Sequence, residues 1–287
     1  MDLIRDAAAL RSRTDAARAA GTDDIALVPT MGALHDGHLS LIRRAREHHP
    51  TVVVSIFVNP PQFSDPADLE RYPRNEERDL SLCEAHGVDV VWAPPVDQVY
   101  PPGIDLPRPD PGPVGSTFEG ASRRGHFEGV LRVVHRLFDV TGPCSAYFGE
   151  KDAQQLFLIR RMVSSESLPV EVVGCPTVRA ADGLALSSRN ARLDPDERDQ
   201  ASCLFLALSE AAALSRRGER DAGALVATMA REVGATPLAR LDYAAVVSDR
   251  AFIPLDRLDP GTPARALIAA RLGSVRLSDN LLLPEPA

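Results

Sequence analysis

Short, strongly apolar runs alternate with amphipathic stretches through the first 175 residues of this 287-residue chain. The clearest run is TVVVSIFV at 51–58, which is almost continuously apolar, as a strand covered on both faces must be. Further strands are predicted at 25–28 (ending at Pro29), 88–92, 146–148 and 170–175, with helices at 39–47, 74–85, 127–140 and 153–164. Strands that alternate with helices predict an α/β fold with a doubly wound parallel sheet.

The pattern changes in the last third of the chain. A helix is predicted from residue 194 to Gly218, because Asp194 as N-cap and Pro195 and Glu197 at the first and third positions favour a helix start. A second helix is predicted at 222–233, with strands at 242–247, 264–269 and 275–277. Helices followed by strands favour a smaller α+β domain. We therefore expect two domains, at 1–177 and 178–287.

Eight of the 24 prolines lie between positions 94 and 113. Because proline fixes φ and lacks a backbone N–H, this stretch is predicted to be neither a helix nor a central strand. A long loop inside a compact domain usually either serves a function or is disordered. Since Phe118, Arg123 and His126 follow the stretch, we favour a lid or a wall of a substrate site.

Composition argues against several classes of protein. The formal net charge of −8 argues against a nucleic-acid-binding protein, and no apolar run approaches the ~20 residues of a membrane span. The four cysteines are far apart and form no C-x-x-C pair, so we expect reduced, buried thiols rather than disulfides or a zinc finger. The first residues lack the pattern of a secretory signal, and a cytoplasmic location is expected.

Lys151 is the only lysine in a chain with 31 arginines. Coding bias accounts for the scarcity of lysine, but it does not account for the one that is present. Lysine carries a compact charge with three rotatable donors, whereas the arginine side chain ends in a planar fork. Chance and a functional need for an ammonium group are therefore both open explanations for Lys151.

A strand, a glycine-containing loop and a helix follow one another at PTMGALHDGH, positions 29–38. This order brings backbone N–H groups and a helix N-terminus to one place, which favours anion binding. His35 and His38 are three residues apart and point the same way, and the positive helix end favours neutral imidazoles that can donate to a phosphate. Alternatively, the pair caps the helix or binds a metal, although no nearby Cys, Asp or Glu has suitable ligand spacing.

Two further motifs carry charge or hydroxyl groups. FGEKD at 148–152 places Lys151 at the end of a predicted strand, where open α/β sheets bind ligands. LSSRN at 186–190 places two hydroxyls and a guanidinium in succession, which suits an anion clamp, although a serine pair is more commonly part of a polar turn. The three motifs in this order are more specific than any one of them.

Together with VSIFVNPPQF, RYPR, HFEGV and YFGEKDAQQL, these motifs resemble the pantothenate synthetase family over about residues 25–195. The resemblance implies a Rossmann-like domain of the HxGH type, similar to the nucleotide-binding domain of class I aminoacyl-tRNA synthetases. It also implies ligation of pantoate to β-alanine by a homodimer. ATP and Mg²⁺ would be required, and a pantoyl adenylate would be the intermediate.

The resemblance further implies which residues act. The expected catalytic residues are His35, His38 (as a proton donor), Lys151, Ser187, Ser188 and Arg189. The expected ATP contacts add Met31, Gly32, Ala33, Leu34, Asp36, Gly37, Gly149, Glu150, Asp152, Val178 (through its backbone) and Leu186. Pantoate and β-alanine are expected to contact Asn59, Gln62, Tyr72 and Gln155, and Asp152 to assist Mg²⁺, which the ATP phosphates mainly hold, with Asp79 as a weaker candidate. These stretches are expected to converge on one triphosphate.

The sequence departs from the family pattern at two positions. Leu186 stands where methionine is usual, a swap that nearly conserves volume. Pro61 stiffens the segment that presents Gln62.

Three other functions are considered. A nucleotidyltransferase would share HxGH but not VNPxQF or the second domain. A tRNA-charging enzyme is disfavoured by the net charge of −8. A nucleotide sensor without turnover would use the same phosphate-binding residues.

Overall fold

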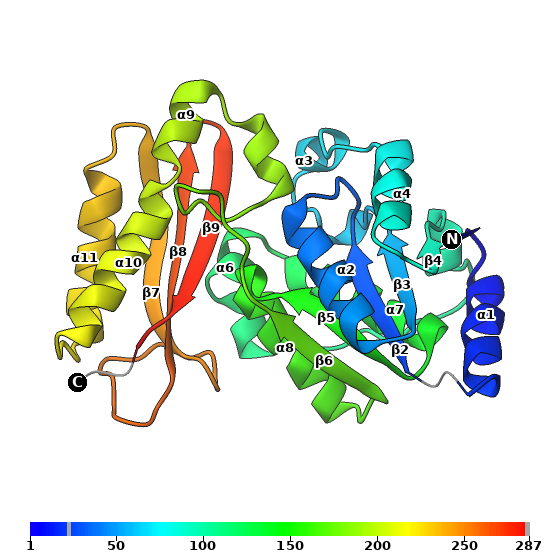
Figure 1. Cartoon of the computed structure of the whole chain (residues 1–287). Coiled ribbons are helices and arrows are strands. Elements are labelled where there is room, and N and C mark those ends of the chain that lie inside the picture. Colours follow the sequence, from blue (N-terminus) through cyan, green and yellow to red (C-terminus); the bar gives the residue numbers. More distant parts are fainter. Residues whose placement is uncertain (22–23, 285–287) are drawn as a thin grey trace. The chain divides into compact units, whose positions relative to one another are not determined.

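The computed structural model describes residues 1–21 and 24–284 (Figure 1). The chain divides into two compact units, which are described separately. Unit 1 comprises Met1–Glu150 and Gln154–Pro176. Unit 2 comprises Lys151–Ala153 and the chain from Thr177 onwards.

Unit 1 is built on a six-stranded sheet in the order β1-β4-β3-β2-β5-β6, in which all paired strands are parallel. The strands are β1 (Asp2–Ile4), β2 (Ile25–Thr30), β3 (Thr51–Ile56), β4 (Val90–Trp92), β5 (Cys144–Gly149) and β6 (Val170–Cys175). The helices are α1 (Ala7–Ala19), α2 (Asp36–His48), α3 (Pro66–Glu70), α4 (Glu76–Ala85), α5 (Val96–Val99), α6 (Glu119–Ser122), α7 (His126–Thr141) and α8 (Ala153–Ser165). Three 3-10 turns are η1 (Pro60–Gln62), η2 (Pro113–Ser116) and η3 (Glu150–Asp152), of which the last two residues of η3 belong to unit 2. The predicted doubly wound parallel sheet is confirmed.

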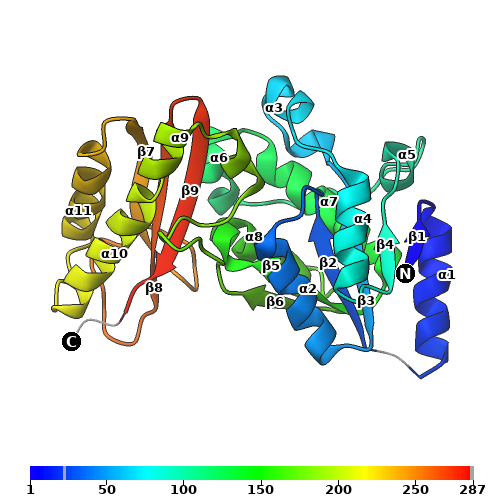
Figure 2. The ribbon, with the colours of Figure 1, turned by 45° about the horizontal axis from the view of Figure 1, so that its top comes forward.

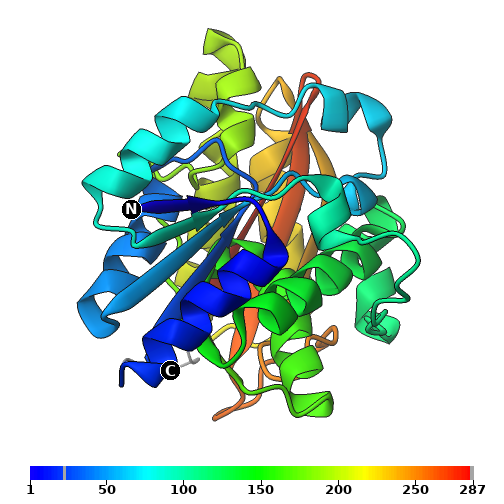
Figure 3. The same cartoon turned by 90° about the vertical axis from the view of Figure 1, so that its right-hand side faces the viewer.

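Helices cover both faces of this sheet, as the apolar strands require (Figure 3). Val52 and Val54 of β3 pack in one cluster with Ile42 of α2 and Cys83 of α4. Val53 lies between them in sequence and points to the opposite face, and it is fully buried as well. The run that predicted a strand covered on both faces is therefore the centre of the sheet.

Strand β2 continues through Pro29 to Thr30, so the prediction that it ends at Pro29 was wrong. It pairs with β3 along its whole length but with β5 only at Ala26 and Leu27. Pro29 lies beyond the pairing with β5, so on that side its missing N–H leaves no gap in the ladder. The strand thus reaches the edge of the sheet at which the HxGH loop (residues 31–38) begins.

The proline-rich stretch contains one helical turn, α5, which the sequence predicted not to form. Pro95 is the N-cap of this turn, and no proline falls within Val96–Val99, so the restrictions on proline do not apply there. Residues 101–111 form neither helix nor strand, as predicted. No helix or strand was predicted for the residues that form β1 and α1.

Unit 2 contains a three-stranded antiparallel sheet in the order β7-β8-β9 (Figure 2). Its elements are η4 (Ser188–Arg192), α9 (Pro195–Gln200), α10 (Cys203–Arg216), α11 (Ala222–Gly234), β7 (Ala239–Ser248), β8 (Ala264–Leu272) and β9 (Val275–Leu282). Apolar side chains of α10 and α11, such as Leu208 and Leu225, pack with Ile268 of β8 in one core. The predicted α+β character is confirmed, with longer strands than predicted.

Two helices, α9 and α10, replace the single helix predicted here. The start is as predicted, because Asp194 accepts from the Glu197 N–H and the Glu197 carboxylate accepts from the Asp194 N–H. The break follows at Ala201, whose N–H donates to Arg198 and whose carbonyl accepts from Leu204. These bonds span three residues instead of four, so the chain tightens locally and the regular helix is interrupted.

All four cysteines are buried and unpaired, as predicted. Burial raises the pKa of the Cys83 and Cys144 thiols to about 12, so both stay protonated and unreactive. Within the described part of the chain, no helix has the length and apolar character needed to cross a membrane.

Candidate active site

The HxGH loop joins the carboxyl end of β2 to the first turn of α2. His35 is the N-cap of α2, and its Nδ1 accepts a hydrogen bond from the Gly37 N–H at 3.2 Å. His38 Nδ1 lies 3.4 Å from the His35 N–H, which completes a capping box made of two imidazoles. The two ring centroids are 4.1 Å apart.

This capping geometry determines which ring nitrogen carries the proton. A backbone N–H can only donate, so the Nδ1 atom of each histidine must act as an acceptor. In the neutral imidazole the proton is therefore on Nε2 of both His35 and His38. The histidines do cap the helix, one of the alternatives considered above, and the cap itself makes both Nε2–H groups donors for an anion.

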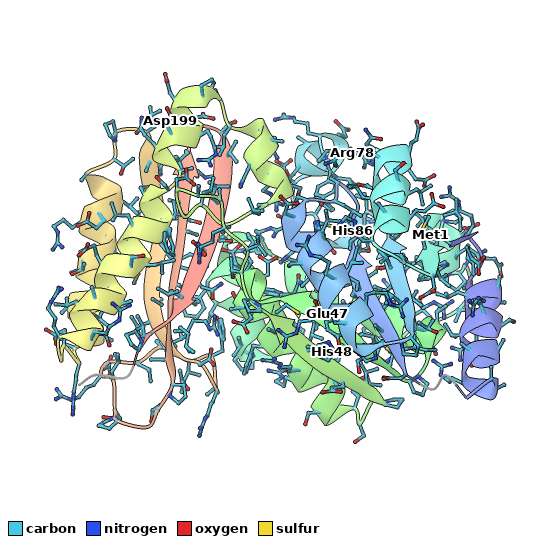
Figure 4. All side chains as sticks on the ribbon, in the orientation of Figure 1. Met1, Glu47, His48, Arg78, His86 and Asp199 are labelled. Atoms are coloured by element: carbon cyan, nitrogen blue, oxygen red, sulfur yellow. The ribbon has the colours of Figure 1, made fainter. Side chains whose placement is uncertain are left out.

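The backbone of the loop is held by Asp79 of α4, which is 1% exposed. One carboxylate oxygen accepts from the Ala33 N–H and the other from the Leu34 N–H, both at 2.8 Å. These bonds hold Ala33 at a φ of +50°, a left-handed conformation that is unfavourable for a residue other than glycine. Arg78, labelled in Figure 4, also donates to the Leu34 carbonyl at 2.9 Å.

Replacing Asp79 with asparagine should lower kcat/KM for ATP, the substrate that the sequence resemblance implies, by about ten- to a hundredfold. Asparagine has one acceptor oxygen, so one of the two loop N–H groups would lose its partner, which costs about 1–3 kcal/mol when the group is buried. Steady-state kinetics with ATP as the varied substrate measures the effect. Glu77→Gln is the matched control, because Glu77 is an exposed acid on the same helix. Equal activity of the two variants would show that the carboxylate does not hold the loop for catalysis.

Two amide side chains lie next to the loop, after the carboxyl end of β3. Asn59 is 1% exposed and donates from Nδ2 to the Gln62 Oε1 at 3.1 Å. Gln62 is 8% exposed, and its Nε2 lies 2.9 Å from the Met31 sulfur. Tyr72 is also buried. Three of the four residues predicted to bind pantoate or β-alanine are thus buried polar side chains, and the structure places Gln62 against the HxGH loop.

The fourth predicted residue, Gln155, is half-buried in the first turn of α8. Its neighbour Gln154 is buried, and its side chain accepts from the Glu119 N–H and donates to the carbonyls of Val114 and Thr117. Gln154 is therefore committed to holding the loop that follows the proline-rich stretch.

Two residues predicted to contact ATP lie at the turn before Lys151: Gly149 ends β5, and Glu150 begins η3.

In unit 2, Lys151 is fixed through its backbone by the antiparallel sheet. Its carbonyl accepts from Nδ2 of Asn280, a residue of β9, at 2.8 Å. Asn280 is 5% exposed, and its Oδ1 accepts from Arg265 of β8 at 2.5 Å. The Lys151 ammonium lies 3.1 Å from Asp152, and the Lys151 side chain is 22% exposed. The sheet therefore fixes the backbone of the lysine, while its side chain remains partly exposed.

The Ser-Ser-Arg segment of unit 2 lies next to Val178. The Leu186 N–H donates to the Val178 carbonyl at 3.0 Å, and Arg179 and Ala185 form a bridge beside this bond. Ser187 is the N-cap of η4. Because the Val178 carbonyl is engaged with Leu186, its N–H is the more suitable group for the predicted contact with adenine.

Nearby, Arg179 forms a bidentate pair with Asp279, at 2.5 and 3.0 Å, and lies 4.3 Å from the Phe205 ring centroid. Asp279 is a residue of β9, like Asn280. The same strand thus anchors Lys151 and the backbone around Val178.

No group of three or more His, Cys, Asp or Glu side chains with metal-binding geometry occurs in residues 1–21 and 24–284. Asp79 is the weaker of the two acids considered for Mg²⁺. Both of its oxygens accept from loop N–H groups, so this carboxylate anchors the loop. The Asp152 side chain is 56% exposed, which fits a single carboxylate that assists an ion held mainly by phosphates.

The structure thus assembles the predicted residues in two sets. Unit 1 brings together Met31–His38, Asn59 and Gln62, and unit 2 brings together Val178 and Leu186–Arg189 and ties Lys151 to β9. The prediction that both sets contact one triphosphate stays a prediction.

Two residues with direct links to these sets, Tyr100 and Asn280, were missed by sequence reasoning. Tyr100 lies among prolines, and Asn280 lies near the end of a predicted strand region. Neither residue stands in a motif that could have identified it.

The comparisons with known proteins agree over almost the whole chain. The family model for pantoate-beta-alanine ligase matches residues 2–282. A pantothenate synthetase from Roseiflexus castenholzii is 51% identical over 268 residues, which cover 93% of this chain and 95% of that protein. One from Roseiflexus sp. is 50% identical, and the match covers 99% of each chain.

Solved structures show the same relationship. A pantothenate synthetase from Thermus thermophilus has a TM-score of 0.91 and 43% identity, covering 99% of this chain and 100% of that one. A pantoate-beta-alanine ligase from Francisella tularensis, complexed with beta-gamma ATP and beta-alanine, has a TM-score of 0.78 and 32% identity, covering 98% and 97%. This chain therefore belongs to the pantoate-beta-alanine ligase family.

Proposed function

We propose that this enzyme ligates pantoate to β-alanine through a pantoyl adenylate. An oxygen of the pantoate carboxylate attacks the α-phosphorus of ATP, and the bond to pyrophosphate breaks. The β-alanine amine then attacks the acyl carbon and loses a proton, and AMP leaves, which gives pantothenate. The first step joins one anion to another, so catalysis depends mainly on charge stabilisation and positioning.

The observation that carries the proposal is the histidine capping box at the carboxyl edge of the parallel sheet. It turns the Nε2–H groups of His35 and His38 into donors beside a helix N-terminus. Phosphate oxygens suit these donors, and donation from His38 stabilises the negative charge that develops during attack on the α-phosphorus. The loop residues Met31–Leu34, together with Asp36 and Gly37, line the nucleotide in this proposal.

In this proposal, unit 2 and the turn η3, which carries Lys151, supply the positive charge at the site. The Lys151 ammonium and the Arg189 guanidinium neutralise the phosphates, while the hydroxyls of Ser187 and Ser188 donate hydrogen bonds. Val178 and Leu186 line the adenosine, and Gly149 and Glu150 lie at the turn that leads to Lys151. The tie from Asn280 to Lys151 supports this assignment, because it fixes the lysine backbone.

Pantoate binds, in this proposal, through the buried amides after β3 and through the half-buried Gln155 of α8. Gln62 and Gln155 hold its hydroxyl and carboxylate oxygens, Asn59 supports Gln62, and Tyr72 forms part of the wall. β-Alanine enters beside Gln62. Burial of Asn59 and Gln62 supports this role, because a buried amide needs polar partners and a substrate oxygen can provide one.

Mg²⁺ is proposed to accompany ATP, held mainly by the phosphate oxygens and assisted by Asp152. The ion would neutralise charge on the phosphates and help pyrophosphate to leave. A single accessible carboxylate fits this mode of binding, since Mg²⁺ in such sites is usually held by one or two carboxylates and substrate phosphates.

We further propose the cytoplasm as the place of action, which the four unpaired cysteines suit. A homodimer and a domain division at 1–177 and 178–287 complete the proposal. The homodimer rests on the family resemblance alone, and light scattering of the purified chain tests it.

Exchange of labelled pyrophosphate into ATP tests the function. The enzyme should catalyse exchange with pantoate present and β-alanine absent, and pantothenate should form when β-alanine is added. Exchange dependent on a phosphorylated acceptor would indicate a different nucleotidyltransferase, and binding of ATP without exchange would indicate a sensor. Either outcome contradicts the proposal.

A further inference from the structure

A chain of hydrogen bonds connects Tyr100 with Gln62 through Asn59. The Tyr100 hydroxyl donates to the Asn59 Oδ1 at 2.6 Å. Asn59 Nδ2 donates both to the Gln62 Oε1 and to the backbone carbonyl of Gly129, each at 3.1 Å. Tyr100 follows β4 and α5, Gln62 follows β3, and Gly129 belongs to α7, so three segments of unit 1 meet at one buried asparagine.

The Gly129 carbonyl sets the direction of the bonds from Asn59, and the Tyr100 hydroxyl holds the Asn59 side chain in the position in which these bonds form. A carbonyl can only accept, so the Asn59 atom beside it must be the amide nitrogen. The Asn59 oxygen then faces Tyr100, and the second N–H of Asn59 faces the oxygen of Gln62. As a result, Gln62 turns its Nε2 towards the Met31 sulfur, at 2.9 Å.

The groups that set this direction are rigid. A Cβ added to Gly129 would lie 2.6 Å from the Pro61 carbonyl oxygen, so only glycine permits this close approach of α7 to η1. The Tyr100 ring lies 4.9 Å from the Arg132 guanidinium and 6.3 Å from the Phe57 ring. Burial raises the pKa of Tyr100 to about 12, so the hydroxyl keeps its proton and stays a donor.

We propose that Tyr100 is a positioning residue for pantoate: through Asn59 it fixes the amide of Gln62 so that its NH₂ group, and not its oxygen, faces the substrate. The thioether of Met31 is a weak acceptor, so a hydroxyl or carboxylate oxygen readily replaces it. This inference rests on the proposed function and adds a specificity determinant to it. The carboxylate of pantoate can only accept hydrogen bonds, and its hydroxyls can accept as well as donate, so an NH₂ group suits every oxygen of this substrate, whereas a Gln62 amide turned the other way would face the carboxylate with a second acceptor.

Tyr100→Phe tests the proposal, because it removes one hydroxyl and keeps the ring. Asn59 would lose its donor and Gln62 could rotate, so the KM for pantoate should rise about tenfold in pyrophosphate exchange, while the KM for ATP should change by less than about twofold. In a Gln62→Ala background the same change should raise the KM for pantoate by less than about twofold, because the residue through which Tyr100 acts is gone.

Tyr147→Phe is the matched control. Tyr147 is a buried tyrosine of unit 1 whose hydroxyl lies 2.7 Å from His49 Nε2, and it has no part in the proposed site. Its KM for pantoate should equal that of the wild type. An unchanged KM in Tyr100→Phe, or an equal rise with and without Gln62, would overturn the proposal.

Asn59→Asp provides a second test that keeps Tyr100 intact. Aspartate still accepts from Tyr100 but cannot donate to Gln62, so the KM for pantoate should rise at least as much as in Tyr100→Phe, and an unchanged KM contradicts the proposal.

Pyrophosphate exchange by the wild-type enzyme distinguishes a failure of this inference from a failure of the proposed function. Pantoate-dependent exchange with no effect of either variant overturns only the role of Tyr100, whereas no exchange in the wild type overturns the function and the inference together.

Discussion

His38→Ala should lower kcat by about a hundred- to a thousandfold, with a change in ATP affinity of less than about threefold. The Nε2–H of His38 is a fixed donor because Nδ1 accepts from the backbone of His35. A donor aimed at charge that develops during attack on the α-phosphorus contributes mainly in the transition state. Single-turnover adenylation gives the rate, and equilibrium binding of a non-hydrolysable ATP analogue gives the affinity.

Two controls separate catalysis from helix capping. His38→Gln keeps an acceptor at the third helical position, so it should restore the stability of α2 without restoring turnover. His48→Ala removes an exposed histidine from the same helix, labelled in Figure 4, and should leave both quantities unchanged. If His38→Ala reduced affinity and turnover equally, His38 would bind the ground state and not act in catalysis.

Lys151→Arg should keep the fold and lose most of the adenylation activity, about a hundredfold in pyrophosphate exchange. The Lys151 ammonium lies 3.1 Å from Asp152 and can turn to donate elsewhere. An arginine at this position would instead pair with Asp152 through its planar fork, which directs its charge away from the phosphates.

The double variant Lys151→Arg with Asp152→Asn tests this explanation. Without the carboxylate the guanidinium is released, so part of the lost exchange should return if capture by Asp152 is the cause. Lys151→Met, which removes the charge, should be no more active than Lys151→Arg. Near-normal turnover of Lys151→Arg would show that the charge matters and the ammonium geometry does not.

Local sequence patterns predicted a helix or strand correctly where the residues of that element alone determine its structure. The apolar run at 51–58 was sufficient for β3, because a strand buried on both faces tolerates few polar residues, and Asp194 with Glu197 predicted the start of α9. The predictions failed where neighbours decided the outcome. Pro29 is tolerated in β2 because β5 pairs with only part of that strand, and no pattern within 25–30 reveals this.

The same distinction applies to the residues of the candidate site. His35, His38 and Lys151 stand in motifs with chemistry that can be recognised from residue type and spacing. Asp79 was considered only as a weak ligand for an ion, whereas the structure shows that it holds the HxGH loop from another helix. Tyr100 and Asn280 act on Gln62 and Lys151 through side chains far away in the sequence, so spacing gave no signal for them.

The sequence by itself determined the parallel α/β architecture, the family and the residues with reactive groups, because strand burial, helix caps and short motifs are encoded within a few neighbouring positions. The tertiary structure alone decided the direction of the Gln62 amide and the fixed backbone of Lys151, whereas the proton on Nε2 of the two histidines follows from a cap within positions 35–38. Hydrogen bonds have a direction, and for these two groups that direction depends on partners 41 to 129 residues apart in the chain, which only the folded chain brings within about 3 Å.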